Sequence, residues 1–437
     1  MASDRQAAVT GAADSLPQAE PEERLSSIPA RYWWMLALLF TVNMVSYMDR
    51  MALGILLQSI KLDMHLSDTQ LGMLTGLAFL LFYCFMGLPL ARLADRSSRI
   101  KLLASCVGLW SIATAATGSA RSFTHLFLAR VGVGIGEAGC SPSAHSLIAD
   151  AFPRRLRTFA IAVFQTGTAL GVGTGLIVVG LLGQYYGWRT AMQAIGLAGI
   201  PLALLLFFTV REPPRNEQEH EAKESAWQSI KALLGRPAYV HLLIAMSLAG
   251  VANSALTQWL PTFLIRSFGM NMAQIGASLG TVTLFTGIIG MLGGGLAATW
   301  LQGRDVRWEL WLPGLAMLFS APVYLAAMFS DSVWFVIGLK IPYNFLHAIS
   351  SGASFGAVQV FAAARQRGMA ISMVQLASSV AGMGLGSFLI GWMSDMFEPS
   401  MGKESLRYAL IVVSVAMPLS ALFYYLSARR CRVDRVG

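Results

Sequence analysis

Two clusters of ionisable residues interrupt the apolar stretches of this chain. The first contains Tyr47, Asp49 and Arg50, and the second contains Arg130 and Glu137. An ionised side chain at membrane depth is costly unless it is paired or hydrated, so such residues usually mark a path for substrate or protons. Two acids and two bases in one half of the sequence therefore predict charge-coupled transport.

The spacing of these residues predicts how they meet. Arg130 and Glu137 are seven residues apart, which on an α-helix is two turns and nearly the same face. Ser141 and His145 continue that face. A rise of ~1.5 Å per residue places Asp49 and Arg130 roughly 10–12 Å from the same membrane surface. We therefore expect Asp49 to pair with Arg130, with Arg50 and Glu137 facing a cavity.

Asp49 and Glu137 are the candidates for proton coupling. Desolvation favours the neutral form of a carboxyl group, whereas a nearby cation favours the charged form. A conformational change that separates such a pair would let the acid take up a proton on one side and release it on the other. Two alternatives remain open: an anionic substrate takes Arg50 or Arg130 as its partner, or the pair only holds the first and fourth helices together.

The composition identifies the setting as a membrane. The chain has 437 residues, of which 55% are hydrophobic and 13% charged, and its mean hydropathy is +0.58. Soluble domains carry roughly 25% charged residues, and ~20 apolar residues cross a bilayer as a helix. The sequence predicts an all-α membrane protein with twelve transmembrane helices, near residues 32–57, 69–91, 100–119, 123–148, 158–183, 188–210, 238–264, 273–300, 309–329, 332–360, 369–393 and 405–427.

The basic residues predict the orientation, because cytoplasmic loops collect Lys and Arg. Most of the 32 basic residues fall on the side of the two termini. Both ends are therefore expected in the cytoplasm, with the protein in the bacterial inner membrane. The net charge of +9 follows from this asymmetry and predicts no nucleic-acid partner. The loops on the other side hold Lys61, Arg121, Arg189, Arg266, Lys403 and Arg407.

A polar interruption divides the predicted helices six and six. We expect a disordered cytoplasmic leader at 1–31, six-helix bundles at 32–210 and 238–427, a cytoplasmic linker at 211–237 with a surface helix near 226–234, and a tail at 428–437. The halves resemble each other at an offset of 210 residues, which aligns Arg130 with Lys340 and Glu137 with His347. Parallel repeats of this kind place the substrate site between the halves, near the midplane.

The second half contributes different chemistry to that predicted site. Its candidates are Asn253, Trp259, Lys340, Asn344 and His347, and Trp259 occupies the position that aligns with Asp49. His347 is expected either to titrate near neutral pH or to stay neutral in a hydrogen bond to a neighbouring helix. We expect no metal site, since the four cysteines lack metal-ligand spacing. We also expect a monomer without a cofactor.

At this point the sequence resembles the major facilitator superfamily. The segment 91–101, Ala-Arg-Leu-Ala-Asp-Arg-Ser-Ser-Arg-Ile-Lys, is similar to that family's signature loop between the second and third helices, although the turn positions Ala91 and Ser98 would usually be glycine. The resemblance implies a cytoplasmic gate, whose candidate residues here are Asp95, Arg96, Arg99, Asp150, Arg157 and Arg367.

The fourth predicted helix, with Gly136-Glu137-Ala138 followed by Leu147-Ile148-Ala149-Asp150, resembles the spinster-like branch of that superfamily. Characterised animal members of the branch move lysolipids or sphingoid phosphates. The resemblance implies a proton-coupled secondary transporter that works by alternating access and carries an amphiphilic, lipid-like substrate.

Two other functions stay open at this stage. One is proton-coupled symport of a small organic anion such as a sugar acid, and the other is a membrane receptor or scaffold without transport. An enzyme is not expected, because no nucleophile, base and acid share one face of a predicted helix.

Overall fold

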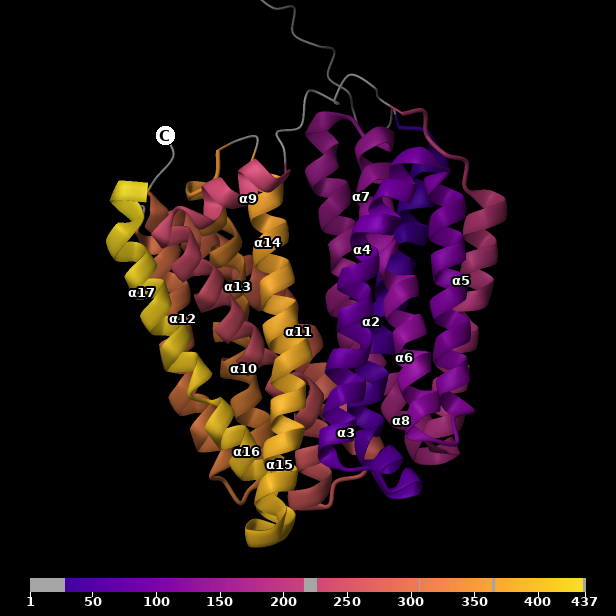
Figure 1. The fold of residues 1–437 in the computed structure, drawn as a ribbon, viewed down its shortest axis with the longest axis vertical. Helices are drawn as coiled ribbons and strands as arrows, with labels where there is room; N and C mark the ends of the chain where they lie inside the picture. Colours follow the sequence, from indigo (N-terminus) through magenta and orange to yellow (C-terminus); the bar gives the residue numbers. More distant parts are fainter. Residues whose placement is uncertain (1–27, 216–225, 306, 364–365, 435–437) are drawn as a thin grey trace, which may run out of the picture.

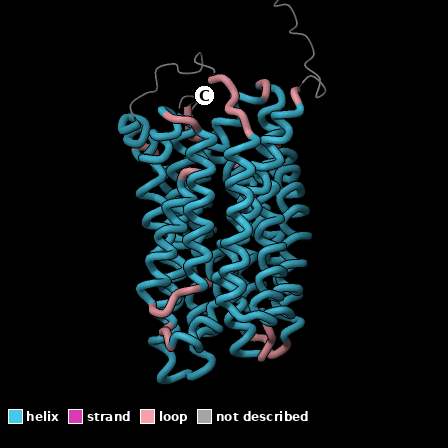
Figure 2. Tube along the Cα trace, turned by 90° about the vertical axis from the view of Figure 1, so that its right-hand side faces the viewer, coloured by secondary structure: helices cyan, strands magenta, loops and turns pink. Residues whose placement is uncertain are grey.

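The computed structural model describes residues 28–215, 226–305, 307–363 and 366–434. Within them the chain forms helices and no strand. The helices run along the long axis in two side-by-side halves, one from each half of the sequence (Figures 1 and 2). Most of the predicted leader and the last residues of the tail lie outside the described ranges.

The elements of the first half are α2 (Ala30–Met64), α3 (Asp68–Gly72), the π-helix η2 (Met73–Leu77), α4 (Ala78–Arg96), α5 (Arg99–Gly118), α6 (Phe123–Ala138), α7 (Cys140–Ala151) and α8 (Arg154–Thr209). The surface helix expected near residues 226–234 is present as α9 (Ala226–Leu234). The second half continues with α10 (Pro237–Phe268), α11 (Met272–Gln302), α12 (Trp308–Met328), α13 (Val333–Val360), α14 (Arg367–Ser379), the π-helix η5 (Val380–Gly386), α15 (Ser387–Met401), the 3-10 turn η6 (Gly402–Glu404), α16 (Ser405–Val413) and α17 (Ala416–Asp434).

Twelve membrane crossings are assembled from these described elements. Six stretches meet the length and hydropathy of a crossing, and Arg155–Thr209 and Arg367–Cys431 are long enough for two each. The two crossings of α8 meet at a kink at Gly187, whose φ of 82° lies in the left-handed region that glycine tolerates. The remaining crossings are α2, α6 with α7, α11 and α13. The predicted fold class is therefore confirmed.

Serine and asparagine side chains determine where several helices begin. Ser67 and Gln70 form a reciprocal capping box at the start of α3, and Asn271 and Gln274 do the same for α11. Ser122 caps α6 through the backbone N–H of His125. Each cap satisfies backbone donors that a helix start leaves free, which fixes the register of the helix that follows.

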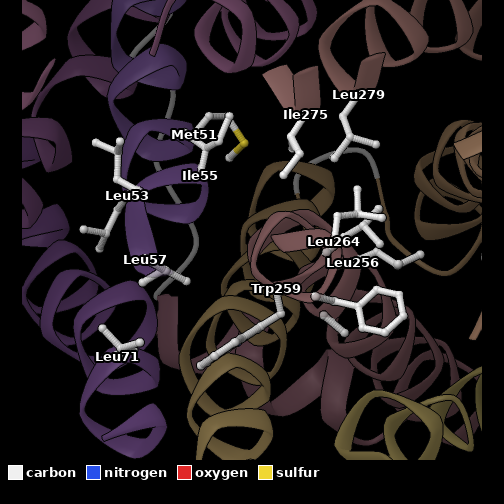
Figure 3. Packing of buried hydrophobic residues seen from close by; sticks show 14 of the residues in the cluster. Met51, Leu53, Ile55, Leu57, Leu71, Leu256, Trp259, Leu264, Ile275 and Leu279 are labelled. Carbon is white, nitrogen blue, oxygen red and sulfur yellow. The ribbon is translucent and has the colours of Figure 1, made fainter. Parts of the chain in front are cut away.

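The hydrophobic core is shared by the halves at one end and divided at the other. We call the end that carries α9 and the C-terminus the linker side, and the opposite end the far side (Figure 1). Toward the far side, one cluster joins Leu57 of α2 to Trp259 of α10 and Ile275 of α11 (Figure 3). Toward the linker side, each half has its own cluster. The halves are thus packed together at the far side and apart at the linker side.

Glycines allow α8 and α11 to touch across the two halves. A Cβ at Gly276 would lie 2.3 Å from the carbonyl oxygen of Leu176, and one at Gly280 would lie 2.6 Å from that of Gly173. Real Cβ atoms do not approach backbone oxygens so closely, so both positions need a residue without a side chain. Small residues permit this close approach of helices in a membrane.

We expect Gly276→Ala to weaken the far-side contact, because the new methyl group would push α11 away from α8. Spin labels on the exposed far-side positions Leu62 and Met401, in a variant without its four cysteines, should report a population with a longer distance in double electron–electron resonance. The control is Gly338→Ala, where a Cβ meets no atom within 4 Å. Equal distance distributions in the two variants would contradict the expectation.

Candidate transport site

Asp49 of α2 and Arg130 of α6 form the ion pair that the sequence predicts. Arg130 Nη2 lies 3.5 Å from Asp49 Oδ1, and both residues are buried, at 3% and 1% exposed. Thr114 donates a hydrogen bond to Asp49, while Thr117 accepts one from Arg130 at 3.3 Å. The hydroxyls of α5 therefore complete a polar cluster between α2 and α6.

Arg50 and Glu137 form a second, shorter pair beside the first. Arg50 Nε and Nη2 each lie 2.6 Å from Glu137 Oε2. The side chain of Arg50 is 17% exposed and that of Glu137 only 1%. The expectation that Glu137 faces a cavity is wrong, because Arg50 stands between it and the open space. Glu137 can therefore be reached from the cavity only past the guanidinium.

Three aromatic rings surround the Arg50 guanidinium. Its Cζ lies 4.9 Å from the ring centre of Tyr47, 5.0 Å from that of Phe79 and 5.3 Å from that of Tyr83. Cation–π contacts of this kind stabilise a desolvated cation.

A cavity of about 480 Å³ lies between the halves and is lined by both. The first half contributes Tyr47, Arg50 and Thr168, along with apolar residues such as Val172 and Leu176. Besides several serines and threonines, the second half contributes the polar residues Asn253, Gln258, Lys340, Asn344, His347 and Gln375. Four of the predicted residues of the second half are thus brought to the cavity: Asn253, Lys340, Asn344 and His347.

Lys340 is a second cation in the cavity wall. Its Nζ donates a hydrogen bond to Asn344 Oδ1 at 3.2 Å, and Asn344 in turn donates one to Thr286 at 3.0 Å. Tyr343 stacks on His347, with ring centres 6.2 Å apart. Among the ion pairs between described residues, none involves Lys340. The amide of Asn344 therefore leaves the ammonium charge uncompensated.

Three predicted site residues lie away from this cavity. Trp259 is fully buried in the shared far-side core (Figure 3) and is not among the residues that line the cavity. Ser141 is exposed, and its carbonyl oxygen lies 2.8 Å from His145 Nδ1. The helix breaks at Gly139 between α6 and α7, so the polar face of Arg130 and Glu137 does not continue to Ser141 and His145.

The predicted gate residues meet only in part. Arg99 bonds Asp150 and the Ser146 hydroxyl, and it also bonds Glu212 at 2.9 Å, an acid that the sequence reasoning had assigned to the linker. Burial raises the pKa of Glu212, but hydrogen bonds from Ser98 and Arg99 outweigh burial and hold that pKa below its usual value.

Of the other gate candidates, the structure describes the side chains of Arg96, Arg157 and Arg367. Arg157 donates a hydrogen bond to the carbonyl oxygen of Phe152 at 3.0 Å. Arg96 and Arg367 are exposed, and the side chain of Asp95 lies outside the described part of the structure. The network around Arg99 therefore ties α5, α7 and the end of α8 together within the first half.

A polar clamp that the sequence reasoning missed joins the halves at the far side. Arg266 of α10 makes two hydrogen bonds of 2.6 Å to Asp68 of α3 and one of 2.7 Å to Gln58 of α2. Lys61 lies 2.8 Å from the same carboxylate. Of the ion pairs between described residues, Arg266 with Asp68 is the one that crosses between the halves. The sequence held no signal for this pair, because Asp68 and Arg266 are 198 positions apart.

Asp395 of α15 strengthens this clamp through the backbone. It accepts hydrogen bonds from the N–H groups of Asp68 and Thr69, at 2.9 and 2.7 Å. A carboxylate at a helix start is favourable because the first N–H groups there are free. We refer to Asp68, Arg266 and Asp395, with their partners, as the far-side clamp.

A helical membrane bundle in two halves, closed at one end around a charged cavity, defines the class of secondary transporters. The chain matches the family model described as Major Facilitator Superfamily over residues 39–387. The chain therefore belongs to the Major Facilitator Superfamily, and it is a multi-pass membrane transporter rather than an enzyme.

Known proteins resemble the chain over most of its length. It is 33% identical to an MFS-type efflux pump of Mycolicibacterium smegmatis, across 93% of this chain and 95% of the relative. Identity is 26% to a sphingosine-1-phosphate transporter of Xenopus tropicalis (90% and 81% covered). Identity is 27% to a probable galactarate/D-glucarate transporter of Bacillus subtilis (70% and 73% covered).

A solved structure resembles this chain over most of its length. It is a bacterial homologue of the human lysosomal transporter Spinster in an inward-facing and unoccupied conformation, with a TM-score of 0.86 and 27% identity over 93% of this chain and 99% of that one. The resemblance to the spinster-like branch is thus confirmed.

We expect Asp68→Asn to open the far side, because it leaves Arg266 and Lys61 without their buried partner. Breaking such a pair costs about 3–5 kcal/mol. The measurement is the reaction of an Asn253→Cys cavity thiol, in a background without the native cysteines, with an impermeant maleimide added to the far side of oriented vesicles. The rate should rise at least tenfold. Asp63→Asn, which removes an exposed pair with Arg189 within the first half, should leave the rate unchanged, and an equal rise there would contradict the role of the clamp.

We expect Glu212→Gln to lower the free energy of unfolding by about 1 kcal/mol at neutral pH. The folded pKa of Glu212 lies below its unfolded value, so its contribution is present above about pH 4.3 and is lost as the pH falls through the folded pKa. Thermal unfolding of both proteins at pH 7 and at decreasing pH should show the difference shrinking. The exposed Glu398, changed to Gln, serves as the control, and a difference that persists at low pH would refute the assignment.

Proposed function

We propose that the protein is a proton-coupled transporter of an amphiphilic anion and works by alternating access. The observation that carries the proposal is the Arg50–Glu137 pair, in which the cation lines the cavity and the acid is buried behind it. A proton on Glu137 removes the charge that holds Arg50. The guanidinium then becomes available to an anionic group of the substrate.

The Asp49–Arg130 pair supports this coupling in a different way. Its 3.5 Å separation is long for a charged hydrogen bond, and Arg130 Nε is buried with no hydrogen-bond partner. The pair thus has room to rearrange when α2 and α6 shift. In the proposal Asp49 and Glu137 are the two proton-binding groups, and Arg130 is the partner of Asp49 in the present conformation.

The cavity favours a substrate with both a charged and an apolar part. Arg50 and Lys340 supply positive charge, and Met51, Val172 and Leu176 supply an apolar wall. Sphingosine-1-phosphate, named for one relative, has this character. We therefore infer an amphiphile with one anionic head as the substrate class.

A small organic anion such as a sugar acid is the second candidate. Asn253, Gln258, Asn344, His347 and Gln375 offer amide and imidazole groups that suit hydroxyls. The relative named as a probable galactarate/D-glucarate transporter favours this reading. The two candidates differ in whether transport needs an apolar tail.

We further propose an orientation of the protein in the membrane and a conformational state for the structure. The linker side, which carries most of the basic residues, would face the cytoplasm of a bacterial cell. The structure would then be an inward-facing, monomeric state of the carrier, closed outside by the far-side clamp. The divided core at the linker side supports this state.

We expect Glu137→Gln and Asp49→Asn to reduce pH-gradient-driven transport at least tenfold in proteoliposomes, since neither amide releases or binds a proton. Wild type and variants are compared with a lysophospholipid and with a panel of sugar acids, and folding is checked by monodispersity and thermal unfolding. Asp63→Asn removes an exposed acid and is the matched control. Full pH-gradient dependence in both site variants would refute the coupling.

A further inference from the structure

An apolar groove lies on the side of the second half, outside the transport cavity. It runs between α12 and α17 and encloses about 490 Å³. Leu315 and Leu318 of α12 and Leu422 of α17 line it, and each is more than 40% exposed. Lipid-facing leucines are ordinary in a membrane protein, but here they border a recess between two helices rather than a filled contact.

A glycine produces this recess. Gly314 of α12 lies against Tyr424 of α17, so that a Cβ there would be 3.0 Å from Tyr424 Cβ. The helices therefore approach closely at the floor of the groove, while the larger side chains on either side form its walls. A chain-shaped apolar molecule fits a recess with this form.

Aromatic residues with polar atoms mark the linker-side end of the groove. Trp308 and Trp311 lie in the first turns of α12, and Tyr425 lies near the middle of α17. Since α12 begins on the linker side, the two tryptophans lie at that end of the groove, and Tyr425 lines the groove from the facing helix. Trp and Tyr are typical of the level of lipid headgroups.

Arginines continue the groove beyond these rings. Arg307 immediately precedes α12, and its Cζ lies 5.9 Å from the ring centre of Trp311. On α17, Arg429 follows Leu422 by seven residues and Tyr425 by four, which places it on the groove face of that helix. The groove thus leads from apolar side chains to two cations.

Basic side chains outnumber the acids at this end of the groove. Asp305 accepts a hydrogen bond from the backbone N–H of Arg307 at 2.8 Å. Arg307 Nε, however, is buried and has no hydrogen-bond partner among the described residues. Arg304 adds a third cation nearby, stacked 4.1 Å from the ring centre of Trp300. Among the described side chains here, three arginines (Arg304, Arg307 and Arg429) stand against two acids (Asp305 and Glu309), so the groove end keeps a net positive charge.

We propose that this groove binds an anionic phospholipid from the membrane leaflet on the linker side. The acyl chain of the lipid would lie between α12 and α17, and its phosphate would lie against Arg307 and Arg429. Basic pockets between transmembrane helices recognise anionic headgroups in this way. The site is distinct from the transport cavity, since the two share no lining residue.

The test uses the tryptophans of the groove as reporters. The purified full-length protein, in mixed micelles, is titrated with brominated phosphatidylglycerol or brominated phosphatidylcholine, which quench nearby Trp fluorescence. Subtracting the signal of Trp308→Phe/Trp311→Phe isolates the groove component. We expect that component to saturate at a mole fraction of phosphatidylglycerol at least fivefold below that of phosphatidylcholine, since each arginine near the headgroups adds about fivefold.

Two variants separate the groove from general surface charge. Arg307→Gln/Arg429→Gln should abolish the preference for phosphatidylglycerol, whereas Arg430→Gln, the neighbouring exposed arginine off the groove face, should leave it within twofold. Equal quenching by both lipids in the wild type, or an unchanged preference in the double variant, would overturn the proposal. A groove signal that depends on protein concentration would assign the groove to a second copy of the chain and would equally overturn it.

Discussion

The need to neutralise buried charge governs the first half of this transporter. Four ionised groups lie in an apolar bundle, and each acid has its cation on a neighbouring helix: Asp49 with Arg130, and Glu137 with Arg50. Removing one partner leaves an uncompensated charge, which in a buried site costs about 3–5 kcal/mol. α2 and α6 are therefore held in register by the same pairs that the proposed proton would separate.

These pairs are connected to the far-side clamp through rigid helices. α2 carries Asp49 and Arg50 and, two turns further, Gln58, which bonds Arg266. Eight residues of helix span about 12 Å, so a tilt of α2 at the ion pairs displaces its far-side end as well. α10 has the same double role, with Asn253 at the cavity and Arg266 in the clamp. The proposed coupling thus needs no separate pathway between the transport site and the far-side clamp.

The fold and the Asp49–Arg130 pair could be predicted from sequence because both depend on position along helices. The depth of a charged residue in the membrane and its spacing from other residues on a helix both follow from its position in the sequence. What failed depends on how helices rotate and break: Glu137 lies behind Arg50, Trp259 faces the core, and Gly139 interrupts the polar face before Ser141. The clamp joins Asp68 to residues some 200 and 330 positions away, and a single sequence contains no signal for such pairs.

The asymmetry of the two halves explains why an anion suits the cavity. The embedded ion-pair cluster of the first half is balanced, since Asp49 and Glu137 match Arg130 and Arg50. The second half adds Lys340, which pairs with no described acid, and offers amides and His347 in place of carboxylates. Lys340 therefore adds positive charge to the wall, and protonation of Glu137 would remove the negative charge that lies behind Arg50. In the proposed cycle, protonation thus increases the attraction of the cavity for an anionic head, while the apolar residues of α2 and α8 remain in place to contact its tail.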